Sequence, residues 1–180
     1  MNYYAFGKFR RGAGPGFTAI EIIIVMVVVA IMAVMATVAI GSVITSYRLN
    51  AATAKVLADI RYAQQQARVK NGWYGVRFQA NPTNKYNVYY TDGASDVDVL
   101  DPSNPAQVLD VDLSGEFDGV QITGVVIGSA TKVEFNPIGT PYEDMNDVSA
   151  LASDGTLTLS LGSAARTIKI FKNTGRAELQ

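Results

Sequence analysis

The N-terminal part of the chain is strongly apolar before it becomes amphipathic. No charged residue occurs from Ile22 to Tyr47, and residues 22–36 are apolar without interruption. A helix over residues 22–44 exceeds the roughly 20 apolar residues that cross a bilayer. The pattern therefore predicts a single transmembrane segment, which we place at residues 17–47.

The same helix is predicted to continue as an amphipathic helix. From residue 45 onward, apolar positions recur at intervals of three and four, which is typical of one helix face. Asn71 and Gly72 then form a typical helix end. We therefore predict one helix over residues 17–71, roughly 80 Å long, whose apolar stripe packs on the rest of the chain. The stripe consists of Leu49, Ala52, Val56, Ile60, Ala63 and Ala67.

Residues 72–180 show the alternation of apolar and polar positions that is typical of β-strands. A hairpin is predicted from residues 74–80 and 86–90, joined by a turn at residues 81–84. The sequence thus predicts an α+β protein in which the long N-terminal helix packs on a head of antiparallel β-sheets. The further predicted strands are Val108 to Leu113, Val120 to Ile127, Lys132 to Phe135, Thr156 to Leu161 and Arg166 to Phe171.

Residues 1–16 have the character of a leader that is removed. They contain Lys8, Arg10 and Arg11, no acidic residue, and a Gly- and Pro-rich end that cannot continue a helix. An ordinary secretory signal is the competing interpretation. Its apolar region would span about 7 to 15 residues, which is shorter than the run observed here.

Composition excludes much familiar chemistry. The chain has no cysteine and no histidine, so disulfides, thiolate chemistry and histidine-dependent catalysis are excluded. Without the three basic residues of the leader, 12 basic and 16 acidic side chains remain. This acidic balance disfavours binding to nucleic acid. We predict no catalytic residue, no metal site and no cofactor, and we expect that the protein is not an enzyme.

Acidic loops and aromatic residues offer two weaker hypotheses. The acidic side chains could supply oxygen ligands for calcium, but their spacing fits no EF-hand loop, and solvated loops are the favoured interpretation. The aromatic residues could form a contact patch, although alternation places Tyr74, Tyr86 and Tyr90 on inward faces and predicts them as core. The acidic residues are Asp92, Asp96, Asp98, Asp101, Asp110, Asp112, Glu116 and Asp118, followed by Glu143, Asp144 and Asp147; the other aromatic residues are Trp73 and Tyr89.

A single carboxylate, Glu21, lies at the start of the apolar helix. An unpaired charge in hydrocarbon costs at least about 3 kcal/mol. One interpretation is that Glu21 remains hydrated in the headgroup layer. The other is that cleavage after Gly16 frees an amine on Phe17, and that this cation pairs with Glu21 of the same chain or of a neighbouring subunit.

This junction resembles the class III signal of type IV prepilins and pseudopilins. The features that carry the resemblance are the basic leader ending at Gly16, then Phe17, Glu21 and the long apolar helix. The resemblance implies that a prepilin peptidase cleaves between Gly16 and Phe17 and that Phe17 is N-methylated. It also implies that Glu21 supports assembly into a filament of packed N-terminal helices.

Two further segments resemble the GspH/FimT-like minor pilins and pseudopilins. They are the helix end ADIRYAQQQARVKNG and the C-terminal pattern FNPIGTP, DGTLTLSL and RTIKIFKNTGRAEL, whereas residues 91–120 match no segment of that family. The resemblance implies a pilin-like fold with two antiparallel sheets and a place at or near a filament tip. Two departures from many major pilins favour a minor subunit: no proline lies between Phe17 and Asn81, and there is no cysteine. Glu178 stands where some DNA-uptake members have a second arginine, so DNA capture is not supported.

The sequence thus predicts a minor subunit of a type IV pilus or of a type II secretion pseudopilus. Its expected partners are a prepilin peptidase, other pilins or pseudopilins and the bacterial inner membrane, with one span and the head in the periplasm or on an extracellular filament. The charge balance across the span is nearly even, so this orientation follows from the resemblance. A major pilin and a signal-anchored periplasmic binding module remain alternatives, and the choice among secretion, pilus and DNA-uptake machines stays open.

Overall fold

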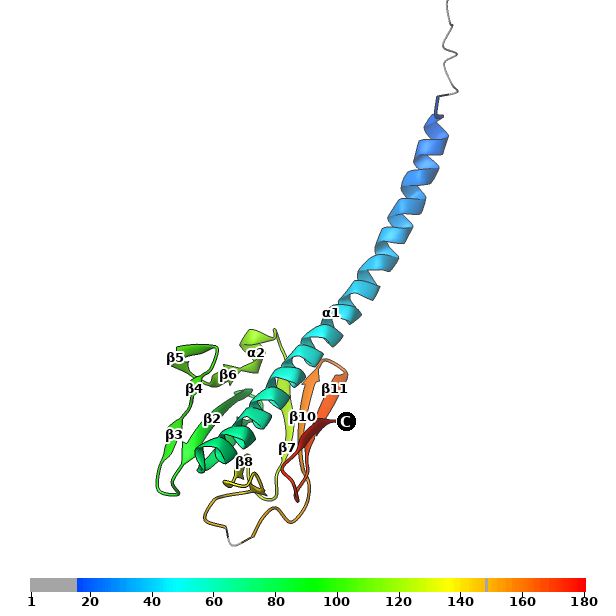
Figure 1. Ribbon diagram of the computed structural model, residues 1–180. Coiled ribbons are helices and arrows are strands. Elements are labelled where there is room, and N and C mark those ends of the chain that lie inside the picture. The colour runs from blue at the N-terminus through cyan, green and yellow to red at the C-terminus, as the bar shows by residue number, and fades with distance from the viewer. Residues whose placement is uncertain (1–15, 148) are drawn as a thin grey trace, which may run out of the picture. The chain divides into compact units, whose positions relative to one another are not determined.

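The structure is a computed structural model that describes residues 16–147 and 149–180, apart from the side chains of residues 36–40 and 42 (Figure 1). Of the predicted leader, only Gly16 lies among the described residues. The chain divides into two compact units, residues 1–42 and 43–180. The second unit contains the predicted head together with the C-terminal part of the long helix, so the helix end belongs to the head rather than to a separate segment.

The long predicted helix is present as α1 (Ala19–Lys70), with 52 residues. It ends where the sequence predicted. Asn71 adopts a positive φ of 51°, and the amide of Gly72 donates to the carbonyl of Ala67 at 3.1 Å. This six-to-one bond with a left-handed residue before its donor is a Schellman motif, in which asparagine tolerates the required conformation.

The apolar stripe of α1 is buried in the second unit, as predicted. All six of its side chains, from Leu49 to Ala67, are 0% exposed. Three of them are alanines, and these small side chains let the helix backbone approach the strands closely. The stripe packs in the same core as Phe78, Tyr86 and Leu157 of the strands.

The larger sheet contains the predicted hairpin. Its main strand order is β3-β2-β1-β8-β9, and β6 also pairs with β2. Within the hairpin, Tyr74 is opposite Tyr90 and Val76 is opposite Val88. All pairings in this sheet are antiparallel. The strands are β1 (Trp73–Gln79), β2 (Lys85–Thr91), β3 (Asp96–Asp98), β6 (Asp110–Asp112), β8 (Lys132–Phe135) and β9 (Pro141–Tyr142).

The second sheet is also antiparallel, in the order β12-β11-β10-β7. Its inner face is formed by Leu157 and Leu159 of one strand and by Ile168 and Ile170 of the next, all 0% exposed. Figure 1 shows the C-terminal half of α1 lying across both sheets. The predicted α+β class is therefore confirmed. The strands are β7 (Gln121–Val126), β10 (Gly155–Leu161), β11 (Ala164–Ile170) and β12 (Ala177–Leu179).

The predicted strand at residues 108–113 is present only as the three residues of β6 (Asp110–Asp112), so its bounds were wrong. The chain instead forms β4 (Leu100–Asp101), β5 (Asn104–Val108), β6 and a short helix α2 (Leu113–Glu116). The break has a physical cause at Leu109, whose amide donates to the carbonyl of Val99 at 2.7 Å and whose carbonyl accepts from the amide of Val88 at 3.1 Å. Leu109 is 1% exposed and separates β5 from β6.

The prediction of three core tyrosines holds for Tyr86 but not for Tyr90. Tyr86 is 1% exposed, whereas Tyr90 is 38% exposed and its neighbour Tyr89 is fully buried. Tyr90 lies on the inner face, but it packs beside Gly72, where α1 has already ended. Its ring therefore stays partly uncovered. Tyr89 is buried on the other face by polar side chains, which alternation does not anticipate.

Candidate functional site

The predicted cleavage junction lies in extended chain just before α1. Gly16, Phe17 and Thr18 precede the first helical residue, Ala19. The side chain of Phe17 is 80% exposed, and a Cβ placed on Gly16 would meet no atom within 4 Å. A peptidase needs an accessible peptide bond outside regular helix, and the bond between Gly16 and Phe17 has both properties.

Thr18 caps the start of α1. Its carbonyl accepts from the amides of Glu21 at 3.1 Å and Ile22 at 3.3 Å, and its hydroxyl oxygen accepts from the amide of Glu21 at 3.3 Å. A threonine followed three residues later by glutamate is the pattern of a capping box, which satisfies amides that have no partner at a helix start. The helix therefore begins at a fixed position relative to Phe17.

Glu21 lies in the first turn of α1, where a carboxylate is favoured by the helix dipole. Its side chain is exposed, and together with Phe17, Ile22, Val25 and Met26 it borders a shallow hollow. Phe17 precedes Glu21 by four residues, which is about one helical turn. In the described chain Phe17 is still bonded to Gly16, so the amine with which Glu21 was predicted to pair has not been formed.

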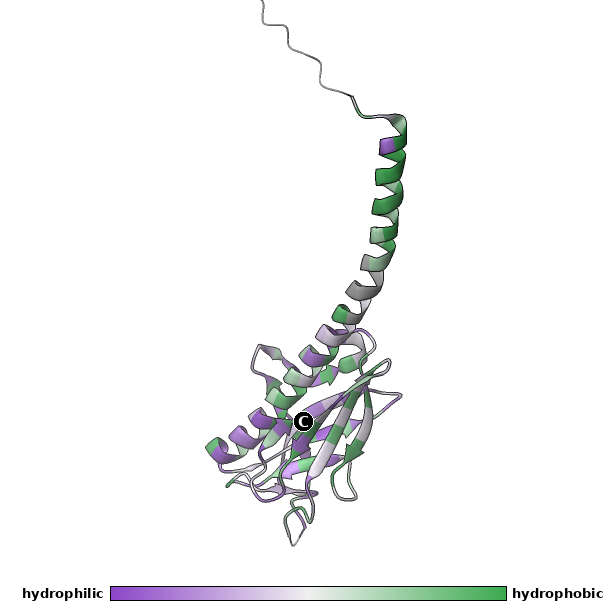
Figure 2. Cartoon of the chain, turned by 90° about the vertical axis from the view of Figure 1, so that its right-hand side faces the viewer, coloured by the Kyte–Doolittle hydropathy of each residue, from purple (hydrophilic) through white to green (hydrophobic). Residues whose placement is uncertain are grey.

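The first part of α1 exposes apolar side chains. Its large apolar residues between Ile20 and Met35 are 45–70% exposed. Figure 2 colours this stretch of the helix as hydrophobic, with a hydrophilic position near its start. A helix that is apolar all round is typical of a segment buried in lipid or among other helices. Within the described residues, no helix meets the length and hydropathy needed to cross a membrane.

Two of the acidic loop residues, Asp92 and Asp112, stabilise local structure. Asp92 accepts from the amides of Ala94 and Ser95, and these hydrogen bonds lower the pKa of its carboxyl. Asp112 caps α2 by accepting from the amide of Gly115 at 3.0 Å. Among the described residues, no group of three or more acidic side chains is placed to hold a metal ion. Asp92 thus stabilises a turn, and Asp112 stabilises a helix start.

A buried polar cluster at Glu134 was not predicted. Glu134 is 1% exposed and accepts from the hydroxyl of Tyr89 at 2.6 Å, the ammonium of Lys132 at 2.8 Å and the amide of Met145 at 2.5 Å. Lys132 also donates to Asp144 at 2.5 Å. Burial alone would lower the pKa of Lys132, but these two carboxylates outweigh it and raise the pKa. The signal in the sequence was Lys132 and Glu134 on one side of a four-residue strand.

The cluster holds the start of the connection after β9 onto the outer face of the larger sheet. The Tyr89 ring lies across Gly75, where an added Cβ would come within 2.7 Å of the ring. The guanidinium of Arg77 covers the same ring at 4.6 Å and pairs with Asp96. Burial and the bond to Glu134 raise the pKa of the Tyr89 hydroxyl, so this group stays protonated and serves as a donor. These contacts fix the packing of the connection on the sheet.

Comparison with known proteins places the fold. By sequence, the chain matches no protein-family model and no curated protein. By structure, it resembles the minor pseudopilin EpsH from the type 2 secretion system of Vibrio cholerae, with a TM-score of 0.55 and 11% identity over 74% of this chain and 96% of that one. It also resembles the type IV minor pilin FimU of Pseudomonas aeruginosa, with a TM-score of 0.50 and 15% identity over 75% of this chain and 90% of that one. The predicted pilin-like fold is therefore confirmed.

Proposed function

We propose that this chain, which has a pilin-like fold, is a structural minor subunit of a type IV pilus or a type II secretion pseudopilus. The observation that carries the proposal is the first part of α1. It combines an accessible Gly16-Phe17 bond, a capped helix start at Thr18, the carboxylate of Glu21 and an apolar surface up to Met35. A β-rich head alone would need none of these features.

In the first step a prepilin peptidase hydrolyses the bond between Gly16 and Phe17. Residues 1–16 leave with a new carboxylate, and Phe17 gains a free amine that is then N-methylated. The exposure of Phe17 and its position before Ala19 support this step, because the scissile bond need not be unwound from the helix. The capping by Thr18 leaves α1 intact after the cut.

In the second step the helix carries the subunit from the inner membrane into a filament. Residues 17–47 form the membrane span and then pack against the corresponding helices of other pilins or pseudopilins, with the head in the periplasm or on the filament surface. The apolar surface of α1 suits both lipid and helix neighbours, so transfer between them exchanges one apolar environment for another. The buried stripe from Leu49 to Ala67 keeps the head attached to the helix throughout.

Glu21 selects the register of that packing. Its carboxylate pairs with the amine of Phe17, preferably on a neighbouring subunit, and the pair neutralises two charges that would each be costly among apolar helices. Attraction between opposite charges is much stronger in such surroundings than in water. A subunit shifted by one turn would leave both charges unpaired.

The test is the incorporation of Glu21→Ala into filaments of the organism's own machine. We expect processing to continue while incorporation falls by at least about tenfold, since an unpaired amine costs a few kcal/mol. Glu116→Ala, which removes an exposed carboxylate of the head, is the matched control and should incorporate normally. Equal incorporation of both variants would contradict the pairing model.

A further inference from the structure

A hairpin of β4 and β5 leaves the edge of the larger sheet. β3 and β6 both pair with β2, at different positions along it. The chain between β3 and β6 forms the hairpin. We call residues 98–110 the acidic hairpin. All five residues of β5 are exposed, and among residues 98–110 only Leu109 is fully buried. An isolated two-stranded hairpin is marginally stable in water, which makes a covering partner favourable.

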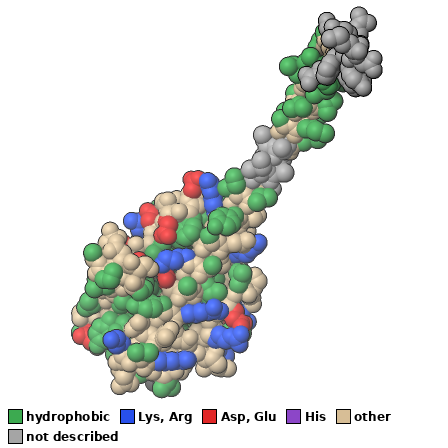
Figure 3. All heavy atoms as spheres, turned by 45° about the horizontal axis from the view of Figure 1, so that its top comes forward, with side chains coloured by type: hydrophobic (Ala, Val, Ile, Leu, Met, Phe, Trp, Pro, Cys, Tyr) green, Lys and Arg blue, Asp and Glu red, His purple; other side chains and the backbone are tan. Residues whose placement is uncertain are grey.

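The acidic hairpin displays apolar side chains. Leu100 is paired with Val108 across it, and these side chains are 54% and 45% exposed. Val97, just before it, is 58% exposed. Figure 3 shows hydrophobic side chains gathered on the β3–β5 side of the head. This small apolar group is the part of a surface that a protein partner would bury.

The charge around the hairpin is strongly negative. Residues 86–131 contain eight acidic residues and no lysine or arginine. Three of these acids pair with Arg77, Lys85 and Arg48, but Asp98, Asp101 and Asp110 form no ion pair among the described residues. Such a surface repels anionic lipid headgroups and nucleic acid, and it attracts a basic protein surface.

The same chain carries a surface of the opposite charge. At the end of α1, Arg68 and Lys70 are exposed and form no ion pair among the described residues, and Val69 between them is 67% exposed. Arg68 donates to the carbonyl of Ile138 at 3.1 Å, which holds Ile138 beside the last turn with 75% of its side chain exposed. We call Arg68, Val69, Lys70 and Ile138 the basic helix end.

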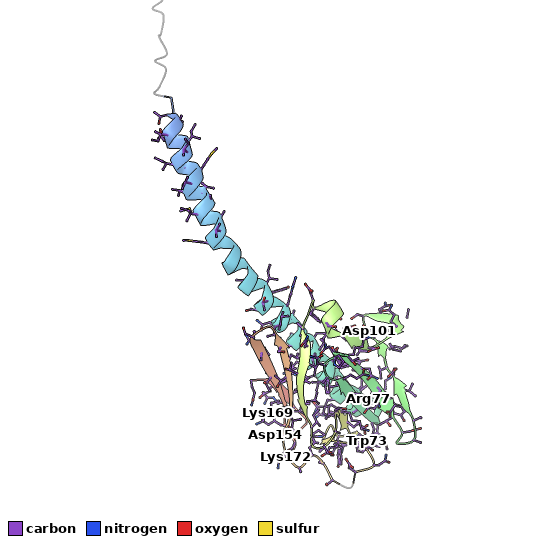
Figure 4. All side chains as sticks on the ribbon, turned by 180° about the vertical axis from the view of Figure 1, so that it is seen from behind. Trp73, Arg77, Asp101, Asp154, Lys169 and Lys172 are labelled. Atoms are coloured by element: carbon purple, nitrogen blue, oxygen red, sulfur yellow. The ribbon has the colours of Figure 1, made fainter. Side chains whose placement is uncertain are left out.

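Other basic side chains of the head are already engaged. Lys169 pairs with Asp154 at 2.9 Å and covers the ring of Phe171, and Lys172 donates to the carbonyl of Ala152. Figure 4 shows Asp154, Lys169 and Lys172 on the side of the head opposite to Asp101. The basic helix end is the better complement, because among the described residues its cations form no ion pair and they stand beside apolar side chains.

We propose that the acidic hairpin of one copy of this chain docks on the basic helix end of a second copy. Leu100 and Val108 then cover Val69 and Ile138, and the acids of the hairpin face Arg68 and Lys70. The contact joins two different surfaces, so each copy keeps its other surface free and the contact can repeat. It is weak alone, but copies held by their helices in one membrane or filament have a high effective concentration. This contact goes beyond the proposed function and does not depend on cleavage or on Glu21.

Engineered disulfides test the contact, since the chain has no cysteine of its own. Full-length chains with Gln107→Cys and with Ile138→Cys, carrying different epitope tags, are co-expressed in membranes and oxidised. We expect the mixed dimer to exceed both same-site dimers. Thr123→Cys, exposed on β7, is the control and should give little product with Gln107→Cys. Equal yields from all pairs, or more of the 107–107 dimer than of the mixed one, would overturn the proposal.

A charge exchange sharpens the test. Asp110→Lys on the Gln107→Cys chain, or Lys70→Glu on the Ile138→Cys chain, should each lower the mixed yield about two- to fivefold, the range of exposed ion pairs. Combining the two charge reversals should restore the yield of the mixed dimer, because the charges again attract. Unchanged unfolding temperatures confirm that each variant is folded. Failure of the combination to recover, with all variants folded, would show that these surfaces do not face each other.

Discussion

At the scale of single residues, the packing of Tyr89 on Gly75 constrains the larger sheet. The ring lies on the glycine because no side chain stands there, and its hydroxyl reaches the buried carboxylate of Glu134. The sequence pattern of β2 pointed to Tyr90 instead, since alternation reports only which face a residue occupies. Burial of Tyr89 on the outer face depends on Lys132 and on the connection after β9, which are distant from it in sequence.

Gly75→Ala tests this packing. The new Cβ would lie 2.7 Å from the Tyr89 ring and 2.9 Å from Glu134, so both must shift, and we expect a loss of about 1–3 kcal/mol in the free energy of unfolding. Gly124→Ala is the matched control in β7, where the nearest atom is 3.5 Å away. It should change stability by less than about 1 kcal/mol. Urea unfolding of residues 43–180, which contain the whole core, measures both. Similar losses would refute the packing argument.

The pair of Lys132 and Asp144 gives a pH-dependent prediction. The hydrogen bond from Lys132 lowers the pKa of the Asp144 carboxyl below its ordinary value of 3.8. Its contribution to stability is therefore complete above that ordinary value and is lost as the pH falls through the lower folded-state value. Lys132 stays protonated across this range because its pKa is raised from 10.5.

We expect Asp144→Asn to be less stable than the wild type near neutral pH and to lose less stability between about pH 5 and pH 3. Urea unfolding of residues 43–180 at a series of pH values measures the difference. Asp110→Asn should follow the wild-type profile, because among the described residues no donor reaches its side chain. An Asp144→Asn profile parallel to that of the wild type would show that the ion pair adds no stability.

At the scale of elements, the sequence predicted the parts whose patterns are local and long. Apolar residues recur at intervals of three and four from Leu49 to Ala67, and they alternate with polar residues in β1 and β2. Each pattern indicates a buried face over several residues, and the predicted helix and strands are present. The short strands β3, β4, β9 and β12 were not predicted, because two or three residues carry no periodic signal. Their positions depend on which neighbouring strand has a free edge.

The alanines of the stripe test the packing of helix on sheets. Ala63 is 0% exposed against the core, so Ala63→Leu should lower the free energy of unfolding by about 1–3 kcal/mol. Ala58→Leu makes the same change at an exposed position of α1 and should stay within about 0.5 kcal/mol of the wild type. Chemical denaturation of residues 43–180 compares them. A loss in Ala58→Leu as large as that in Ala63→Leu would refute close packing as the cause.

At the scale of the whole molecule, the candidate site could be predicted from the sequence because its residues are close together in the chain. Gly16, Phe17 and Glu21 lie within six residues, and the structure adds the exposure of Phe17 and the cap at Thr18. The acidic hairpin was not predicted as a surface. Its exposure depends on the pairing of β3 and β6 with the same strand, β2. The structural similarity to EpsH and FimU covers 74% and 75% of this chain and shows the fold.

The central claim is that this chain is a subunit cleaved behind Gly16 and built into a filament. The most direct test is the intact mass of the full-length protein, extracted from membranes of cells with and without a prepilin peptidase. The account predicts that, only with the peptidase, the mass falls by that of residues 1–16 and rises by one methyl group. A mass that stays that of the uncut chain, with an active peptidase present, would contradict the account.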